Sequence, residues 1–435
     1  MAIAIFLLTL ALVIWQPRGL GIGYTALGGA LLALATGVVT LQDIATVWAL
    51  VWNATFTTIA LVIIALILSE AGVFQWIALW LAYTSFGRGH LLFALVLLLG
   101  ASVTALLNNY STALIWTPAL LELLRVLGFT TKATWAFVFA TGFIADATSL
   151  PLPVSNLVNI VTTDYFQIPV LDYVLVMIPV NFVAIATGIT VLWFYCDGYI
   201  PFSYNLDRMP PPSSAIRDPL VCQWSFPILG LLPIAYFFAQ PLNVPFSALT
   251  ASAALVMLAL AGRWFHRKDT AVIAIDLVFR DIPWQVILFV LGLFIITLSL
   301  CNTALTTLLS QLLKQLSGWG LTQVAIGTGF IAALLAGVMN NFSAGLINAL
   351  AINDIFGIDS TVREVMIYAS AIGCNIGAKI TPIGSLSTLL WLDVLARKGQ
   401  ALHWSQYSRI AFILTFPVLF VSLLSLAIWL PWLIA

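Results

Sequence analysis

The sequence predicts an all-α membrane protein with about ten transmembrane helices and two re-entrant helical hairpins, arranged as two inverted-topology repeats whose broken helices meet at the membrane midplane. Three observations lead to this prediction. Of the 435 residues, 62% are hydrophobic and only 7% are charged, against roughly a quarter charged in soluble domains. Apolar stretches of about 20 residues, the length that spans a bilayer, recur along the whole chain. Polar breaks interrupt these stretches at matching places in two halves.

Ten apolar stretches predict membrane crossings. No basic residue precedes the first of them, so we expect a retained span and not a cleaved signal peptide. The predicted crossings cover residues 2–16, 21–40, 46–69, 133–163, 173–196, 222–239, 246–263, 283–303, 365–391 and 407–434. The chain is therefore expected to be one membrane unit with no soluble catalytic domain, and we predict a transporter and no enzyme.

Two further apolar regions are each interrupted midway by a pair of asparagines. Residues 90–127 contain Asn108-Asn109, and residues 321–352 contain Asn340-Asn341. Since exposed amides are costly inside hydrocarbon, each region is interpreted as a helical hairpin that turns back before crossing. Amphipathic stretches precede both hairpins, at 74–84 and 305–317, and are expected to lie along the membrane interface.

The distribution of basic residues predicts the orientation in the membrane. If the hairpins are re-entrant, one face collects thirteen Lys and Arg residues and the other only Lys314 and Arg363. Since basic loops stay inside, we expect the 197–221 and 264–282 loops in the cytoplasm and both termini outside. The sixteen basic and sixteen acidic residues cancel, so net charge indicates no nucleic-acid partner. The thirteen basic residues are Arg18, Arg88, Arg125, Lys132, Arg208, Arg217, Arg263, Arg267, Lys268, Arg280, Arg397, Lys398 and Arg409.

An internal repeat relates the two halves. The segment LLNNYSTAL at 106–114 matches VMNNFSAGL at 338–346, so the paired asparagines are 232 residues apart. Each half has an odd number of predicted crossings, so the second half enters the membrane from the opposite side, as in many secondary transporters. We predict a first repeat at 1–197, a cytoplasmic linker at 198–221 and a second, inverted repeat at 222–435.

Four polar breaks form the candidate substrate site. They are the two hairpin tips and the proline-containing stretches 149–156 and 380–388. Helix ends leave backbone groups unpaired, and amide and hydroxyl side chains add donors and acceptors. Proline kinks mended by small polar residues would explain one break, but four matching breaks favour a binding site. The candidate substrate-binding residues are Asn108, Asn109, Ser111, Thr112, Ser149, Ser155, Asn156, Asn340, Asn341, Ser343, Asn375, Thr381, Ser385 and Ser387.

Asp146 and Lys379 are the two charged side chains predicted at membrane depth. Each lies just ahead of the proline-containing break in its half, and an ionisable residue inside a membrane is a functional candidate by default. We predict that they couple transport to protons, with Asp146 taking up and releasing the proton. The alternative is that Asp146 caps a helix end, or that the two form a static ion pair.

Several motifs are absent from the sequence. The four cysteines, Cys196, Cys222, Cys301 and Cys374, contain no CxxC pair, so neither a disulfide framework nor a resident metal site is predicted. No GxxxxGK[ST] loop occurs, which argues against ATP hydrolysis by the P-loop route. We predict no cofactor.

Three long segments resemble the arsenite efflux permease family of the ion transporter superfamily, and the likeness covers nearly the whole chain. They are VIWQPRGLGIG at 13–23, GFIADATSLPLPVSNLVNIV at 142–161 and GCNIGAKITPIGSLSTLLWLDVL at 373–395. The resemblance implies a multi-pass carrier in the lipid bilayer of the inner membrane. Such a carrier expels arsenite and antimonite, in exchange for protons, and in some organisms works with an arsenite-stimulated ATPase subunit.

The sequence departs from the family pattern at the candidate site. It has Asn109-Tyr110-Ser111 where the family has Asn-Asp-Gly, and Asn375 and Ala378 replace a usual Asp and Pro. Two carboxylates are therefore missing, which makes Asp146 the main candidate for the proton carrier.

The leading hypothesis is antiport of As(OH)3 and a proton by alternating access. Trivalent arsenic is mostly an uncharged trihydroxide at neutral pH, which suits a pocket of amides, hydroxyls and backbone groups. One alternative is a sodium-coupled anion carrier or sodium/proton antiporter of the same superfamily, since Asn, Ser and carbonyl oxygens also bind sodium. Another is the membrane subunit of an ATPase-driven arsenite pump.

Overall fold

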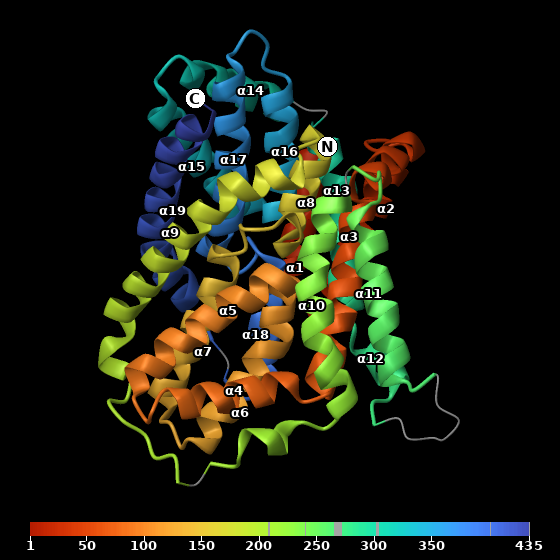
Figure 1. The fold of residues 1–435 in the computed structure, drawn as a ribbon. Helices are drawn as coiled ribbons and strands as arrows, with labels where there is room; N and C mark the ends of the chain where they lie inside the picture. The colour runs from red at the N-terminus through yellow and green to blue at the C-terminus, as the bar shows by residue number, and fades with distance from the viewer. Residues whose placement is uncertain (208, 240, 265–271, 302–303, 401, 435) are drawn as a thin grey trace.

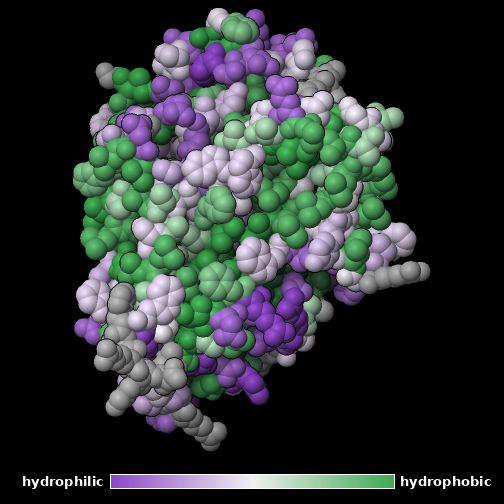
Figure 2. All heavy atoms as spheres, turned by 90° about the vertical axis from the view of Figure 1, so that its right-hand side faces the viewer, coloured by the Kyte–Doolittle hydropathy of each residue, from purple (hydrophilic) through white to green (hydrophobic). Residues whose placement is uncertain are grey.

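The computed structural model describes residues 1–207, 209–239, 241–264, 272–301, 304–400 and 402–434. Over these ranges the chain is helical, and its only β-type pairing is an isolated backbone bridge between Arg88 and Ser203. Figure 2 shows a broad apolar belt across the face in view, with polar residues gathered towards its two ends. This surface suits a bilayer, and the predicted class of an all-helical, multi-pass membrane protein is confirmed.

The two halves present their helices in the same order. Each has two initial helices, a helix at the position of the third crossing, a helix ahead of the hairpin, the hairpin, a broken helix and a long final helix. The first half contains α1 (Ala2–Trp15), α2 (Ile22–Ala35), α3 (Leu41–Glu70), α4 (Val73–Thr84), α5 (Gly89–Ser111), the π-helix η2 (Thr112–Trp116), α6 (Thr117–Val126), α7 (Thr131–Ala147), α8 (Leu157–Phe166) and α9 (Val170–Cys196). The second contains α10 (Pro219–Ala239), α11 (Phe246–Ala261), α12 (Ile275–Asp281), α13 (Trp284–Cys301), α14 (Ala304–Ser317), α15 (Leu321–Met339), α16 (Asn341–Asn353), α17 (Ser360–Gly377), the 3₁₀ turn η6 (Ala378–Ile380), α18 (Leu386–Arg397) and α19 (Trp404–Ile434).

The lengths of several predicted spans differ from the structure. Among the described residues, seven helical stretches are long and apolar enough to cross a membrane. The predicted spans at the start of the halves include α1, α2 and α11, which have only 14, 14 and 16 residues. Helix α2 ends at Ala35, before the predicted end at 40, because Gly37 adopts a φ of 70° and the Val38 amide bonds back to the Ala33 carbonyl. A left-handed glycine is a common helix stop.

The predicted loop at 264–282 is wrong in its second part, which contains helix α12. Its charged residues obscured an apolar spacing, in which Val278 and Ile282 are buried and the helix packs against α3. Residues 265–271 of this loop, and with them Arg267 and Lys268, lie outside the described residues, as does Arg208.

The two ends of the molecule carry different parts of the chain. Figure 1 shows both termini and α14 at the top, while α4, α6 and the linker between α9 and α10 lie at the bottom. Both termini therefore lie at the end opposite the 198–218 linker, as the predicted crossings require. That the bottom end faces the cytoplasm stays a prediction.

The halves exchange packing partners. Helix α2 packs against α13, and α11 packs against α3, so the second helix of each half packs against a helix of the other half. The final helices α9 and α19 pack together, as do α5 with α7 and α15 with α17. Figure 1 shows α1–α3 and α10–α13 on the right, called here the right-hand bundle. The hairpins and broken helices lie beside it, with α9 and α19.

The linker is held against the bottom of the first half by backbone hydrogen bonds. The Gly89 amide donates to the Phe202 carbonyl (3.2 Å), and the Arg217 amide donates to the Ala71 carbonyl (2.9 Å). A Cβ added at Gly89 would lie 1.8 Å from the Pro201 backbone oxygen, so this close approach needs glycine. The base of the first hairpin is thereby fixed to the linker.

Candidate functional site

Both hairpin tips turn at an asparagine with an unusual backbone conformation. Asn108 has φ 71° and ψ 168°, and Asn340 has φ 83° and ψ 147°. This region costs non-glycine residues on the order of 1–3 kcal/mol. Each side chain offsets part of that cost by capping the helix that follows, because Asn108 Oδ1 accepts from the Ser111 amide (3.0 Å) and Asn340 Oδ1 from the Phe342 amide (3.2 Å). The two tips therefore use asparagine in the same way, 232 residues apart.

The second asparagine of each pair has free hydrogen-bonding capacity. Asn109 and Asn341 are fully buried. Among the described residues, Asn109 Oδ1 and both amide atoms of Asn341 have no hydrogen-bond partner, and the same is true of Asn108 Nδ2 and the Tyr110 hydroxyl. A buried polar group left unpaired costs about 1–3 kcal/mol, so such a cluster is expected to hold water or a ligand.

The two tips lie close to one another. The rings of Tyr110 and Phe342 stack with centroids 6.5 Å apart. Phe342 also contacts Phe294 of α13, at 6.0 Å. The two hairpin tips are therefore neighbours beside the right-hand bundle.

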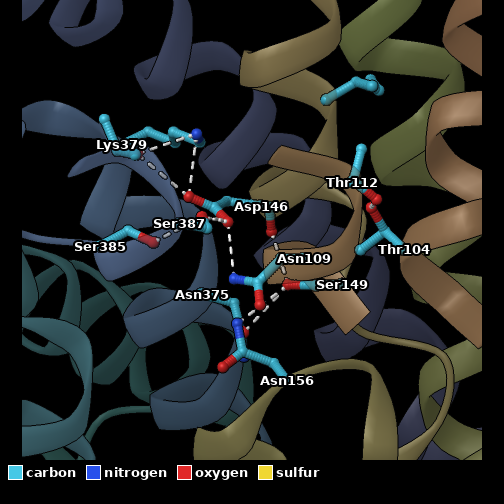
Figure 3. A network of polar contacts seen from close by, with 12 residues as sticks. Thr104, Asn109, Thr112, Asp146, Ser149, Asn156, Asn375, Lys379, Ser385 and Ser387 are labelled. Atoms are coloured by element: carbon cyan, nitrogen blue, oxygen red, sulfur yellow. Dashed lines mark hydrogen bonds and ion pairs between the residues drawn. The ribbon is translucent and has the colours of Figure 1, made fainter. Parts of the chain in front are cut away.

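Asp146 is the centre of a buried polar network (Figure 3). Its carboxylate is 2.8 Å from Lys379 Nζ and accepts from Asn109 Nδ2 at 2.6 Å. The hydroxyls of Ser387 and Thr388 also donate to it, Thr388 at 3.3 Å. Asp146 and Lys379 are 1% and 2% exposed at their side chains, so the ion pair is shielded from solvent.

Helix ends make this pairing favourable. Ser387 and Thr388 belong to the first turn of α18, where the helix dipole attracts an anion, and Lys379 follows the end of α17, where it attracts a cation. A buried ion pair needs further hydrogen bonds to compensate its loss of hydration. The network supplies them, and so links the broken helix of the first half to that of the second.

A second set of contacts joins the same two breaks. Asn375 Nδ2 donates to Asn159 Oδ1 (2.7 Å), and Ser149 Oγ donates to Asn375 Oδ1 (3.2 Å). Asn156 Nδ2 donates to Ser149 Oγ at 3.1 Å. Hydrogen bonds therefore join the two broken helices at Asn375 as well as at Asp146.

Other predicted site residues bond to backbone carbonyls or to other polar side chains. Ser155 Oγ donates to the Ser149 carbonyl (2.8 Å), and Thr381 Oγ1 to the Gly337 carbonyl. In the same group, Asn340 Nδ2 donates to the Ile383 carbonyl, and hydroxyl pairs join Thr112 to Thr104, Ser343 to Thr297 and Ser385 to Ser387. Ser111 donates to Asn108 Oδ1. That these residues bind substrate stays a prediction.

Three residues outside the predicted set belong to the site. Asn159 bonds Asn375 and the Ser149 carbonyl, Thr388 accepts from Lys379 Nζ at 3.0 Å, and Tyr110 lies between the tips. Two of them could have been predicted from the sequence. Asn159 lies three residues after Asn156, on the same helix face, and Thr388 lies within the second break.

The arrangement offers many neutral donors and acceptors and one titratable pair. Over the described ranges, no group of three His, Cys, Asp or Glu side chains could hold a metal ion. The site is therefore a cluster of neutral donors and acceptors around one buried carboxylate–ammonium pair.

Comparison with known proteins identifies relatives of this chain. The family model described as "Arsenical pump membrane protein" matches residues 1–430. A protein named "Arsenical pump membrane protein" from Escherichia coli is 46% identical over 425 residues, covering 98% of this chain and 97% of the relative, and one from Yersinia enterocolitica has the same identity and coverage. A "Putative arsenical pump membrane protein" from Bacillus subtilis is 26% identical over 446 residues, covering 98% of this chain and 99% of the relative.

Proposed function

The chain belongs to the arsenical pump membrane protein family, and from that premise we propose that it exports arsenite and antimonite across the inner membrane in exchange for protons. The transport is secondary active and proceeds by alternating access between two inverted repeats, 1–197 and 222–435. The linker at 198–221 and the loop at 264–282 face the cytoplasm. Lipid surrounds the apolar belt.

The observation that carries this proposal is the position of Asp146. Its carboxylate joins the tip of the first hairpin, through Asn109, to the second broken helix, through Lys379 and Ser387. A change in its charge therefore acts on both repeats at once. An intramembrane carboxylate in such a position is suited to couple proton movement to a conformational change.

The uncharged trihydroxide As(OH)3 binds at the free amides of the tips. Asn341 supplies one donor and one acceptor, Asn109 Oδ1 a further acceptor, and Asn108 Nδ2 and the Tyr110 hydroxyl further groups. Each hydroxyl of the solute can donate and accept. The Asp146–Lys379 pair has no net charge, so the site needs no counter-ion for a neutral solute.

Proton uptake by Asp146 from the outside releases the substrate there. The proton breaks the ion pair with Lys379 and weakens the charge-assisted bond from Asn109, because such bonds are roughly twice as strong as neutral ones. The protonated carrier returns, the proton leaves to the cytoplasm, and the ion pair forms again. One As(OH)3 moves out as one proton moves in, so the cycle carries one positive charge inward.

The test is transport by the purified protein in proteoliposomes. Arsenite flux driven by an imposed pH gradient in sodium-free buffer is the expected result, and Asp146→Asn should abolish the response to the gradient while the protein still folds. Flux that requires sodium would favour the sodium-coupled alternative. Flux against a gradient only with an added ATPase subunit and ATP would favour the pump alternative, and unchanged coupling in Asp146→Asn would exclude Asp146 as the proton carrier.

A further inference from the structure

Two cavities lie between the right-hand bundle and the broken helices, at opposite ends of the molecule. The bottom cavity has a volume of about 670 Å³ and lies between α2, α13 and α18. The top cavity, of about 330 Å³, lies between α3, α8 and the start of α11. The top cavity therefore lies between the bundle and α8, which follows the first proline-containing break. The bottom cavity lies between the bundle and α18, which follows the second.

The two cavities are equivalent parts of the internal repeat. Trp52 and Asn53 line the top cavity, and Trp284 and Gln285, 232 positions later in the chain, line the bottom one. Asn53 Oδ1 accepts from the Ser247 amide of α11 (3.0 Å), as Gln285 Oε1 accepts from the Gly23 amide of α2 (3.0 Å). The amide side chains thus have the same role within the bundle at both ends.

One hydrogen bond breaks this equivalence. Asn53 Nδ2 donates to Asp164 Oδ2 of α8 at 2.8 Å and so ties the bundle to the broken helix across the top cavity. At the bottom, no hydrogen bond between described residues joins Gln285 to α18, and Asp393 of α18 pairs with Arg397 of its own helix (2.8 Å). A polar contact crosses the top cavity, and the bottom cavity, which is twice as large, lacks such a contact among the described residues.

The bottom cavity reaches towards the Asp146 network. Its lining includes Leu389 and Leu390, which follow Thr388, and Leu114 of η2. Thr388 donates to the Asp146 carboxylate. The lining of the cavity therefore includes the residues that directly follow Thr388 in the chain, next to the Asp146 network.

From this geometry we infer that the bottom cavity is the vestibule through which the small neutral trihydroxide enters from the cytoplasm, and that the Asn53–Asp164 hydrogen bond is the latch of the outer gate. The identity of the solute rests on the proposed function; the gate does not. The structure is the inward-facing state. Opening of the outer gate requires this bond to break, after which α8 separates from α3 while Asn53 keeps its bond to Ser247.

The experiment measures thiol accessibility in a variant without the four native cysteines. A single cysteine is introduced at Leu390, in the vestibule, or at Thr163, which lines the top cavity and is 3% exposed. A membrane-impermeant maleimide is applied to inside-out and right-side-out vesicles. We expect Leu390→Cys to be labelled only in inside-out vesicles and Thr163→Cys to be labelled slowly in right-side-out vesicles. Fast labelling of Thr163→Cys from outside, or labelling of Leu390→Cys from that side, would overturn the inference.

Gate variants test the latch. Asp164→Ala removes the acceptor, and Asn53→Asp keeps the acceptor for Ser247 while placing a second carboxylate opposite Asp164. Either change should raise Thr163→Cys labelling from outside about ten-fold, which corresponds to about 1.4 kcal/mol. Gln285→Ala, the equivalent amide without a bond to α18, is the control and should leave labelling unchanged. No change in the two gate variants, or an equal change in the control, would refute the latch.

This labelling needs no arsenite and no pH gradient. A protein that shows the expected accessibility but moves no arsenite would refute the proposed function and leave the gate standing. A protein that transports arsenite but shows no effect of the gate variants would refute the gate alone.

Discussion

Replacement of Lys379 by methionine tests the buried ion pair directly. In the variant, the Asp146 carboxylate loses the ammonium group at 2.8 Å and keeps three neutral donors, from Asn109, Ser387 and Thr388. Removing one partner of a buried pair costs about 3–5 kcal/mol. The three remaining hydrogen bonds place the expected loss at the lower end, about 3 kcal/mol. Methionine keeps the length and apolar stem of lysine, so cavity formation adds little.

The assay is thermal unfolding of the detergent-purified protein, followed by size-exclusion chromatography of the heated samples. Lys379→Met should lower the melting temperature by on the order of 5 °C. The double variant with Asp146→Asn, which removes both charges, should recover most of that loss, because no charge is then left unpaired. Additive losses in the double variant, or a Lys379→Met protein as stable as the wild type, would show that the pair is not a buried, mutually dependent unit.

Four further changes test substrate binding, helix capping, a buried ion pair and the docking of the linker. Asn341→Ala should raise the KM for arsenite about ten-fold and leave the melting temperature unchanged, because its side-chain amide has no partner among the described residues. Asn340→Ala should instead lower stability by about 1 kcal/mol through loss of a helix cap. Equal effects of the two alanine variants on KM in proteoliposomes would contradict this division. Asp218→Asn should cost about 2 kcal/mol, since Arg263 at 2.8 Å loses its buried carboxylate, and an unchanged melting curve would argue against that pair. Gly89→Val should prevent the linker from docking, because a Cβ would lie 1.8 Å from a linker backbone oxygen; limited proteolysis should then cut the linker faster, and wild-type resistance would contradict the expected effect.

Much of the candidate site was identified from the sequence because its signal is local. Asparagine, serine and proline inside apolar helices mark breaks without any knowledge of tertiary contacts. The two asparagine pairs were found in this way, and so were Asp146 and Lys379. The same local signal does not distinguish polar side chains that have a partner from those that have none. Only the tertiary structure shows that the Ser155 hydroxyl bonds a backbone carbonyl while the side-chain amide of Asn341 has no partner among the described residues.

The sequence by itself determined the fold class, the repeat and the places where helices break, because hydropathy and helix-breaking residues act over one or two turns of chain. The tertiary structure decided which separated groups meet. It paired Asp146 with Lys379 and brought Asn159 to Asn375. It also joined Asn53 to Asp164 at one end of the molecule, whereas no such bond between described residues joins Gln285 to α18 at the other end. These contacts depend on how helices that are far apart in the sequence pack against each other. The repeat places an amide side chain at both ends, Asn53 and Gln285, and only the packed helices show that Asn53 meets a carboxylate of another helix.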